Sequence, residues 1–216
     1  DYILLHQVFV SLLIVALVLF RQNALMNQAK TLFLSPTDPI EVMNVINLLN
    51  ASKASGPNSI PSHLFKLCSP ILCKPISFII NESFNQGTFP DIQTLAKVTP
   101  VYKSGPTEVC SNYRPISLLS NLSKVIEKTM CTRLNDFLKK YELLYDLQFG
   151  FRKNYSTNHA LINLVTNIND ILEGGEYACG IFIDLQKAFD TVNHDILLHK
   201  LEIYGVRGIP LDWFES

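Results

Sequence analysis

Residues 180–194 read GIFIDLQKAFDTVNH, in which an apolar run is followed by two carboxylates. The run begins at Tyr177, follows a Gly-Gly break and is rich in β-branched and aromatic residues, so we predict a buried strand over residues 177–183. A carboxylate at the end of a buried strand, here Asp184, loses hydration unless a partner such as Mg²⁺ compensates. An aspartate that merely starts a turn fits the same pattern, and both interpretations stay open at this level.

The chain has 216 residues, a length that accommodates one folded domain and a short appendage. Its hydrophobic fraction of 48% is sufficient for a buried core. The net charge of −1 is not that of a strongly basic nucleic-acid protein. The charge is uneven, because residues 97–153 hold ten Lys and Arg against five Asp and Glu, whereas residues 154–216 hold three against nine. A basic middle suits a phosphate backbone and an acidic end suits cations, although two ordinary solvated faces fit equally well.

The five cysteines are odd in number and scattered, with no CxxC pair. This pattern predicts neither a zinc site nor a disulfide framework, and it favours reduced thiols in an intracellular setting. The sequence contains no GxxxxGK[ST], HExxH or GxSxG motif, which argues against P-loop, zinc-protease and serine-hydrolase chemistry.

The N-terminal region holds an apolar segment over residues 2–20, whose core, residues 8–20, reads VFVSLLIVALVLF. Its length is marginal for a bilayer span of about 20 residues. Three interpretations stay open: a transmembrane or anchor segment, a buried helix, and sequence foreign to the domain. If the segment spans a membrane, the following Arg21 and Lys30 place the remainder in the cytoplasm.

Helical periodicity alternates with loop signals along the rest of the chain. We predict a helix after Pro39, helical sequence over 64–85 interrupted near Pro70 and Pro75, and a stop at Gly87. Two short strands, 95–102 and 113–119, are expected to form a β-hairpin.

Three further helices are expected, over 121–141, from Ser156 to the Gly-Gly break, and from about residue 193 to Gly205. In the first, the basic residues lie mainly off the apolar face: Lys124, Lys128, Arg133, Lys139 and Lys140. In the second, the predicted buried stripe consists of Ala160, Leu161, Leu164, Val165, Ile168 and Ile171.

Four sequence blocks carry a family resemblance, and they stand in the family's order. They are SGPNSIP at 55–61, NYRPISLL at 112–119, QFGFR at 148–152 with Ser156-Thr157, and FIDLQKAFDTVNH at 182–194. Together they resemble the reverse transcriptases of non-LTR (LINE-type) retrotransposons, over roughly residues 38 to 210. The first block departs from the family at Asn58, where an aspartate is usual.

The resemblance implies an α/β (α+β) polymerase fold, helix-rich fingers with a small antiparallel β-hairpin and a partial palm. The implied division is a hydrophobic segment at 1–25, a helical region at 26–94, fingers at 95–175 and the start of the palm at 176–216. The implied reaction is RNA-templated DNA synthesis by a two-metal mechanism with Mg²⁺, or alternatively Mn²⁺.

The resemblance also assigns roles to single residues. Asp184 would be the catalytic carboxylate and, with the carbonyl of Leu185, a metal ligand, while Phe189 would lie under the incoming sugar. Lys103 and Arg114 would bind the dNTP triphosphate. Gln148, Gly150 and Arg152 would contact the template strand. For Arg152 an alternative stays open, in which it pairs with a carboxylate such as Asp146.

The family's second carboxylate motif, Tyr/Phe-X-Asp-Asp, does not occur in this sequence. We therefore expect the chain to be inactive by itself, with RNA template, DNA primer and dNTPs as the partners of its parent polymerase, in the cytoplasm or nucleus. Two alternatives remain: a non-catalytic nucleic-acid-binding remnant, and a protein anchored to a membrane through residues 2–20.

Overall fold

The computed structural model describes residues 30–52, 56, 60–185 and 191–216. The chain forms two compact units: the first is Gln28–Lys140 with Gly205–Ser216, and the second is Tyr141–Tyr204 with Asp1–Asn27. Each unit is described by itself. The apolar segment at 2–20, for which an anchor was one of three interpretations, lies outside the described residues, and no helix in the described ranges has the length and apolar character needed to cross a bilayer.

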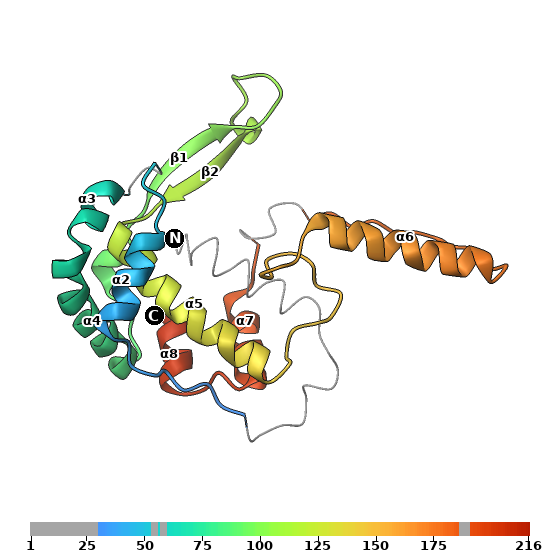
Figure 1. Ribbon diagram of the computed structural model, residues 1–216. Coiled ribbons are helices and arrows are strands. Elements are labelled where there is room, and N and C mark those ends of the chain that lie inside the picture. Colours follow the sequence, from blue (N-terminus) through green and yellow to red (C-terminus); the bar gives the residue numbers. More distant parts are fainter. Residues whose placement is uncertain (1–29, 53–55, 57–59, 186–190) are drawn as a thin grey trace. The chain divides into compact units, whose positions relative to one another are not determined.

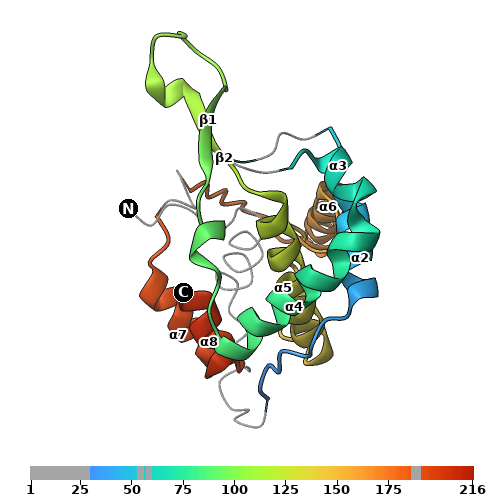
Figure 2. The ribbon, with the colours of Figure 1, turned by 90° about the vertical axis from the view of Figure 1, so that its left-hand side faces the viewer.

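The first unit is helical with one β-hairpin (Figure 1). Its elements are α2 (Pro39–Leu48), α3 (Ser62–Leu67), α4 (Ser69–Gln86), β1 (Lys97–Tyr102), β2 (Tyr113–Leu118), α5 (Asn121–Lys140) and α8 (Ile209–Glu215), with short 3-10 turns at Asp91–Gln93 and Cys110–Asn112. The predicted hairpin is confirmed, and with it the helix-rich α/β class. In both ribbon views the hairpin projects beyond the helices of its own unit (Figures 1 and 2).

Local signals explain where these helices begin and end. The Oδ1 of Asp38 accepts a hydrogen bond from the Glu41 amide at 2.8 Å and caps α2, which has Pro39 in its first turn. The predicted interruption near Pro70 is the boundary between α3 and α4, whereas the one predicted near Pro75 is wrong, because α4 continues through that proline. Gly87 ends α4 in the left-handed conformation, with φ at 64°.

The core of the first unit lies between α2, α4 and α5. The fully buried apolar side chains of these three helices are Val42, Ile46, Ile80, Val125, Ile126 and Met130. Helix α8, which the periodicity did not predict, packs on α4. Trp213 donates a 2.8 Å hydrogen bond from Nε1 to the Ser83 hydroxyl, and its ring meets those of Phe84 and Phe89 edge-on.

Arg133 corrects the expectation that the basic residues of α5 lie off its buried face. Its side chain is only 8% exposed and forms a 2.8 Å ion pair with Glu41 of α2. The guanidinium also lies over the Phe84 ring, at 5.3 Å. The prediction failed because the partner carboxylate comes from a distant part of the chain, which a helical period does not reveal.

The second unit contains α6 (Thr157–Glu173) and α7 (His194–Tyr204). The predicted start of α6 at Ser156 is confirmed: the Ser156 side chain accepts from the third residue's backbone, and the His159 side chain accepts from the Ser156 amide. The predicted burial of its apolar stripe is wrong, since no residue of α6 is buried. Periodicity identifies the face that can be covered, but burial requires a second surface, and no described residue provides one.

The predicted buried strand at 177–183 is also wrong. Residues 177–185 form neither helix nor strand, and their side chains are exposed, with Phe182 at 87%. A strand exists only by pairing with another strand, and the one ladder among the described residues joins β1 to β2. The β-branched composition therefore indicates strand propensity, but no described strand pairs with this segment.

Candidate functional site

The β1–β2 hairpin brings two of the predicted substrate-binding residues together. The strands are antiparallel, and Val101 pairs with Arg114. The amide of Lys103 donates to the Asn112 carbonyl at 2.8 Å, so the register continues one step beyond the strands. Because side chains alternate between the faces of a strand, Lys103 and Arg114 are placed on the same face of the hairpin, which also carries Lys97.

The loop that joins the two strands is held by its own side chains. Asn112 donates from Nδ2 to the Pro106 carbonyl at 2.7 Å, and Tyr113 donates its hydroxyl to the Thr107 carbonyl at 3.0 Å. On the opposite face of the hairpin, the rings of Tyr102 and Tyr113 meet at 5.6 Å. The loop is therefore ordered by local contacts, which keeps the positions of the flanking cations constant.

The two cations of this face are available to an anion. Lys103 and Arg114 are both exposed. Neither side chain has a hydrogen bond or an ion pair within the described ranges. A lysine point charge next to an arginine fork is a suitable arrangement for the oxygens of a triphosphate or of a nucleic-acid backbone.

The loop between α5 and α6 holds the predicted template residues Gln148, Gly150 and Arg152. Gln148 is 1% exposed, and its Nε2 donates to the Gly150 carbonyl at 3.2 Å, so it supports the loop from inside. Gly150 is exposed, and a Cβ added there would meet nothing within 4 Å. No neighbour in the described chain requires a glycine, which leaves the backbone at Gly150 open to a ligand.

Arg152 is not paired with a carboxylate among the described residues. Its Nη1 donates to the Tyr145 carbonyl at 2.8 Å, and its guanidinium lies 4.3 Å from the ring centre of Tyr155. The stacking keeps the positive charge at the surface of the loop.

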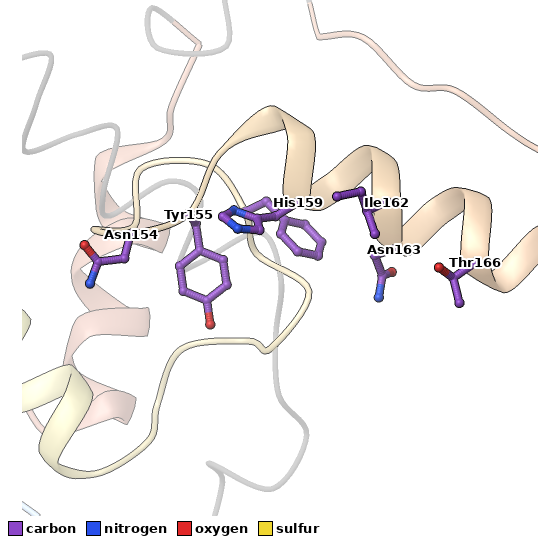
Figure 3. Close-up of a pocket in the computed structure, with 7 residues that line it drawn as sticks. Asn154, Tyr155, His159, Ile162, Asn163 and Thr166 are labelled. Carbon is purple, nitrogen blue, oxygen red and sulfur yellow. The ribbon is translucent and has the colours of Figure 1, made fainter.

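Next to this loop is a pocket of about 520 Å³ that the sequence did not predict (Figure 3). Its lining residues are Phe149, Asn154, Tyr155, His159, Ile162, Asn163 and Thr166. The residues from α6 follow an i, i+3, i+4, i+7 pattern and so share one side of the helix. The signal in the sequence is the cluster of aromatic residues around the helix start.

The predicted metal site around Asp184 lacks most of its ligands among the described residues. Asp184 and Leu185 lie in the exposed 176–185 segment, and Phe189 lies outside the described residues. Mg²⁺ needs several oxygen ligands, and the described ranges contain no group of three Asp, Glu, His or Cys side chains that could hold a metal ion. The Asp184 carboxylate with the Leu185 carbonyl is therefore an incomplete ligand set in this part of the chain.

Comparison with known proteins gives the family. The sequence model described as reverse transcriptase (RNA-dependent DNA polymerase) matches residues 101–216, more than half of the chain. The chain belongs to the reverse transcriptase family. The match includes Lys103, Arg114, the 148–152 loop and Asp184, so all of these positions lie within the reverse transcriptase domain.

Three of the similar proteins come from Drosophila melanogaster. The chain is 34% identical over 171 residues to the probable RNA-directed DNA polymerase from transposon BS of Drosophila melanogaster, covering 77% of the chain and 19% of that protein. It is 35% identical over 162 residues to the polymerase from the mobile element jockey of the same species, covering 74% and 18%. It is 30% identical over 182 residues to the probable polymerase from transposon X-element, also of D. melanogaster, covering 84% and 20%.

These matches confirm that the chain is a LINE-type reverse transcriptase sequence. The chain spans about a fifth of the length of these relatives.

Proposed function

We propose that this chain forms the nucleotide- and template-binding part of an RNA-directed DNA polymerase encoded by a non-LTR retrotransposon. The observation that carries the proposal is the hairpin face on which Lys103 and Arg114 are exposed, with no acidic partner among the residues that the structure describes. A dNTP triphosphate supplies the missing negative charge. The RNA template and the DNA primer are the other partners, and the location is intracellular.

The proposed division places fingers over residues 95–175 and the start of the palm over 176–216. The Asp184 carboxylate and the Leu185 carbonyl would hold Mg²⁺, or Mn²⁺, once further carboxylates join them, and Phe189 would lie under the sugar of the dNTP. Because the sequence has no Tyr/Phe-X-Asp-Asp motif, the chain by itself is expected to bind substrates without joining them.

The nucleotide site is tested with a fluorescent dATP analogue, whose anisotropy reports binding to the full chain. Arg114→Ala removes a fork of charged donors and is expected to weaken binding about tenfold or more. Lys139→Ala removes one positive charge from an exposed position on α5 and is expected to have little effect. Equal losses in the two variants would show that the hairpin attracts nucleotides only through net charge.

The polymerase is tested by primer extension on an RNA template with dNTPs and Mg²⁺. The given chain is compared with a longer version that carries a family-type downstream palm and thumb. The proposal expects extension only by the longer version, and expects Asp184→Ala to abolish it. A correctly folded longer version that extends no primer would refute the polymerase proposal and favour a nucleic-acid-binding role without chemistry.

A further inference from the structure

The pocket beside the 148–152 loop combines features that suit one planar, aromatic ligand. Three of its lining side chains carry rings, and the Tyr155 ring lies 6.0 Å from that of Phe149 and 6.1 Å from that of His159. No lining residue is acidic. The surroundings therefore favour an aromatic group attached to an anion over a cationic ligand.

Tyr155 has the geometry of a stacking platform. One face of its ring is covered by the Arg152 guanidinium at 4.3 Å, and the residue is still 40% exposed. The exposed part can take a second planar group, and the arginine on the other face adds positive charge near any phosphate that accompanies it.

Polar groups around the platform can read the edge of such a ligand. Asn154, Asn163 and Thr166 line the pocket and offer amide and hydroxyl groups, and Asn163 and Thr166 project from α6 on the side where the Tyr155 ring lies (Figure 3). The His159 Nδ1 accepts from the Ser156 amide at 3.1 Å. The ring hydrogen is then on Nε2, which is left as a donor.

The loop that builds the pocket contains two non-glycine residues in the left-handed region. Phe151 has φ at 59° and Asn154 has φ at 69°. Asparagine tolerates this conformation, whereas phenylalanine adopts it at a cost. Conformations of this kind concentrate at binding sites, where the surrounding contacts maintain them.

We infer that this pocket holds one unstacked base of a single-stranded nucleic acid, stacked on Tyr155. A nucleobase has the π face that the ring requires and the donors and acceptors that the asparagines match. The adjoining phosphates would lie near Arg152 and Lys153. The inference rests on the proposed function, because it takes the template strand to be the ligand.

The test uses the full chain and a single-stranded RNA oligonucleotide that carries 2-aminopurine, a base whose fluorescence falls when it stacks on an aromatic ring. Wild type is expected to bind the RNA and quench the probe. Tyr155→Ala is expected to lose the quenching and about tenfold or more in affinity. Tyr155→Phe keeps the ring and is expected to retain both. Tyr177→Ala, which removes an exposed tyrosine outside the pocket, is the control.

A second pair of variants avoids any effect on the ring. Asn163→Asp places a negative charge in the pocket, whereas Asn169→Asp places the same charge elsewhere on α6. The Asn163 variant is expected to bind RNA several-fold more weakly than the Asn169 variant at low salt. This comparison stands even if Tyr155→Ala does not fold.

The inference is overturned if wild type does not quench the probe, if Tyr155→Ala quenches like wild type, or if the two aspartate variants bind equally. These outcomes are separate from failure of the polymerase proposal. If the longer chain extends primers but Tyr155→Ala quenches the probe normally, only the inference about the pocket is rejected. If quenching depends on Tyr155 but the longer chain extends no primer, only the polymerase proposal is rejected.

Discussion

Replacing Arg133 by methionine should strongly destabilise the first unit, because every donor of its guanidinium is used. Nε donates to the Ser35 carbonyl at 2.7 Å. Nη1 donates to Glu41 Oε1 at 2.8 Å and to the Thr129 carbonyl at 3.1 Å. Nη2 donates to Glu41 Oε2 at 3.0 Å and to the Pro36 carbonyl at 3.1 Å. The single side chain therefore joins α5 to α2 and to the segment before α2.

The expected loss follows from what the substitution leaves behind. Removing one partner of a buried ion pair costs about 3–5 kcal/mol, because the other charge stays without compensation. The Glu41 side chain is 32% exposed, so water can rehydrate part of the carboxylate, and we expect the lower end, about 3 kcal/mol. With a urea dependence of about 1.5 kcal/mol per molar, the unfolding midpoint should fall by about 2 M.

Trp213 provides the readout, since it is the single tryptophan of the chain and contacts Ser83 and Phe84 in the same unit. Urea unfolding followed by its fluorescence is compared for wild type, Arg133→Met and Lys128→Met, which makes the same change at an exposed position of α5. Lys128→Met should shift the midpoint by less than about 0.3 M. Equal shifts in the two variants, or full additivity of Arg133→Met with Glu41→Gln, would refute the reasoning.

Three further predictions concern acid stability, a glycine and a thiol. The hydrogen bond from Arg133 lowers the pKa of Glu41 below its ordinary 4.5. The stabilisation by this pair is therefore complete above pH 4.5 and is lost as the pH falls through the lowered pKa of the folded state. Below pH 4.5, urea midpoints should fall more steeply for wild type than for Glu41→Gln. Gly205→Ala should cost about 3 kcal/mol in the same assay, because φ is 103° and a Cβ would clash with the Lys30 carbonyl oxygen. A Gly205→Ala variant with the urea midpoint of wild type would contradict this expectation. Burial raises the pKa of the Cys131 thiol above its ordinary 9.0, so in single-cysteine variants it should react with a disulfide reagent more slowly than the exposed Cys110.

Features set by neighbours in the sequence could be predicted. The hairpin was marked by the turn residues between its strands, and α4 ended at Gly87 as expected. Helix α5 was marked by a long apolar stripe, most of which is buried. The grouping of Lys103 with Arg114 is a consequence of that same hairpin. In each case the information lies within one element or its adjoining turn.

Features set by distant partners could not be predicted from the residues alone. The ion pair of Arg133 joins residues 92 positions apart, and α8 is held by contacts of Trp213 with α4. Conversely, the stripe of α6 and the apolar run at 177–183 had correct local signals, but no described residue covers them. Periodicity identifies the apolar face of a helix or strand, but that face is buried only if another part of the protein packs on it.

The same distinction separates binding from chemistry in this reverse transcriptase sequence. The hairpin face and the pocket are each built from one continuous stretch of chain, 97–118 and 149–166, so their side chains are brought together by local folding. A metal site is different, because it needs carboxylates from separate strands, and Asp184 lies on a segment with no strand partner among the described residues. Substrate binding should therefore be present in the chain as given, while nucleotide incorporation should appear only when further sequence pairs with the 177–183 run and brings ligands to Asp184.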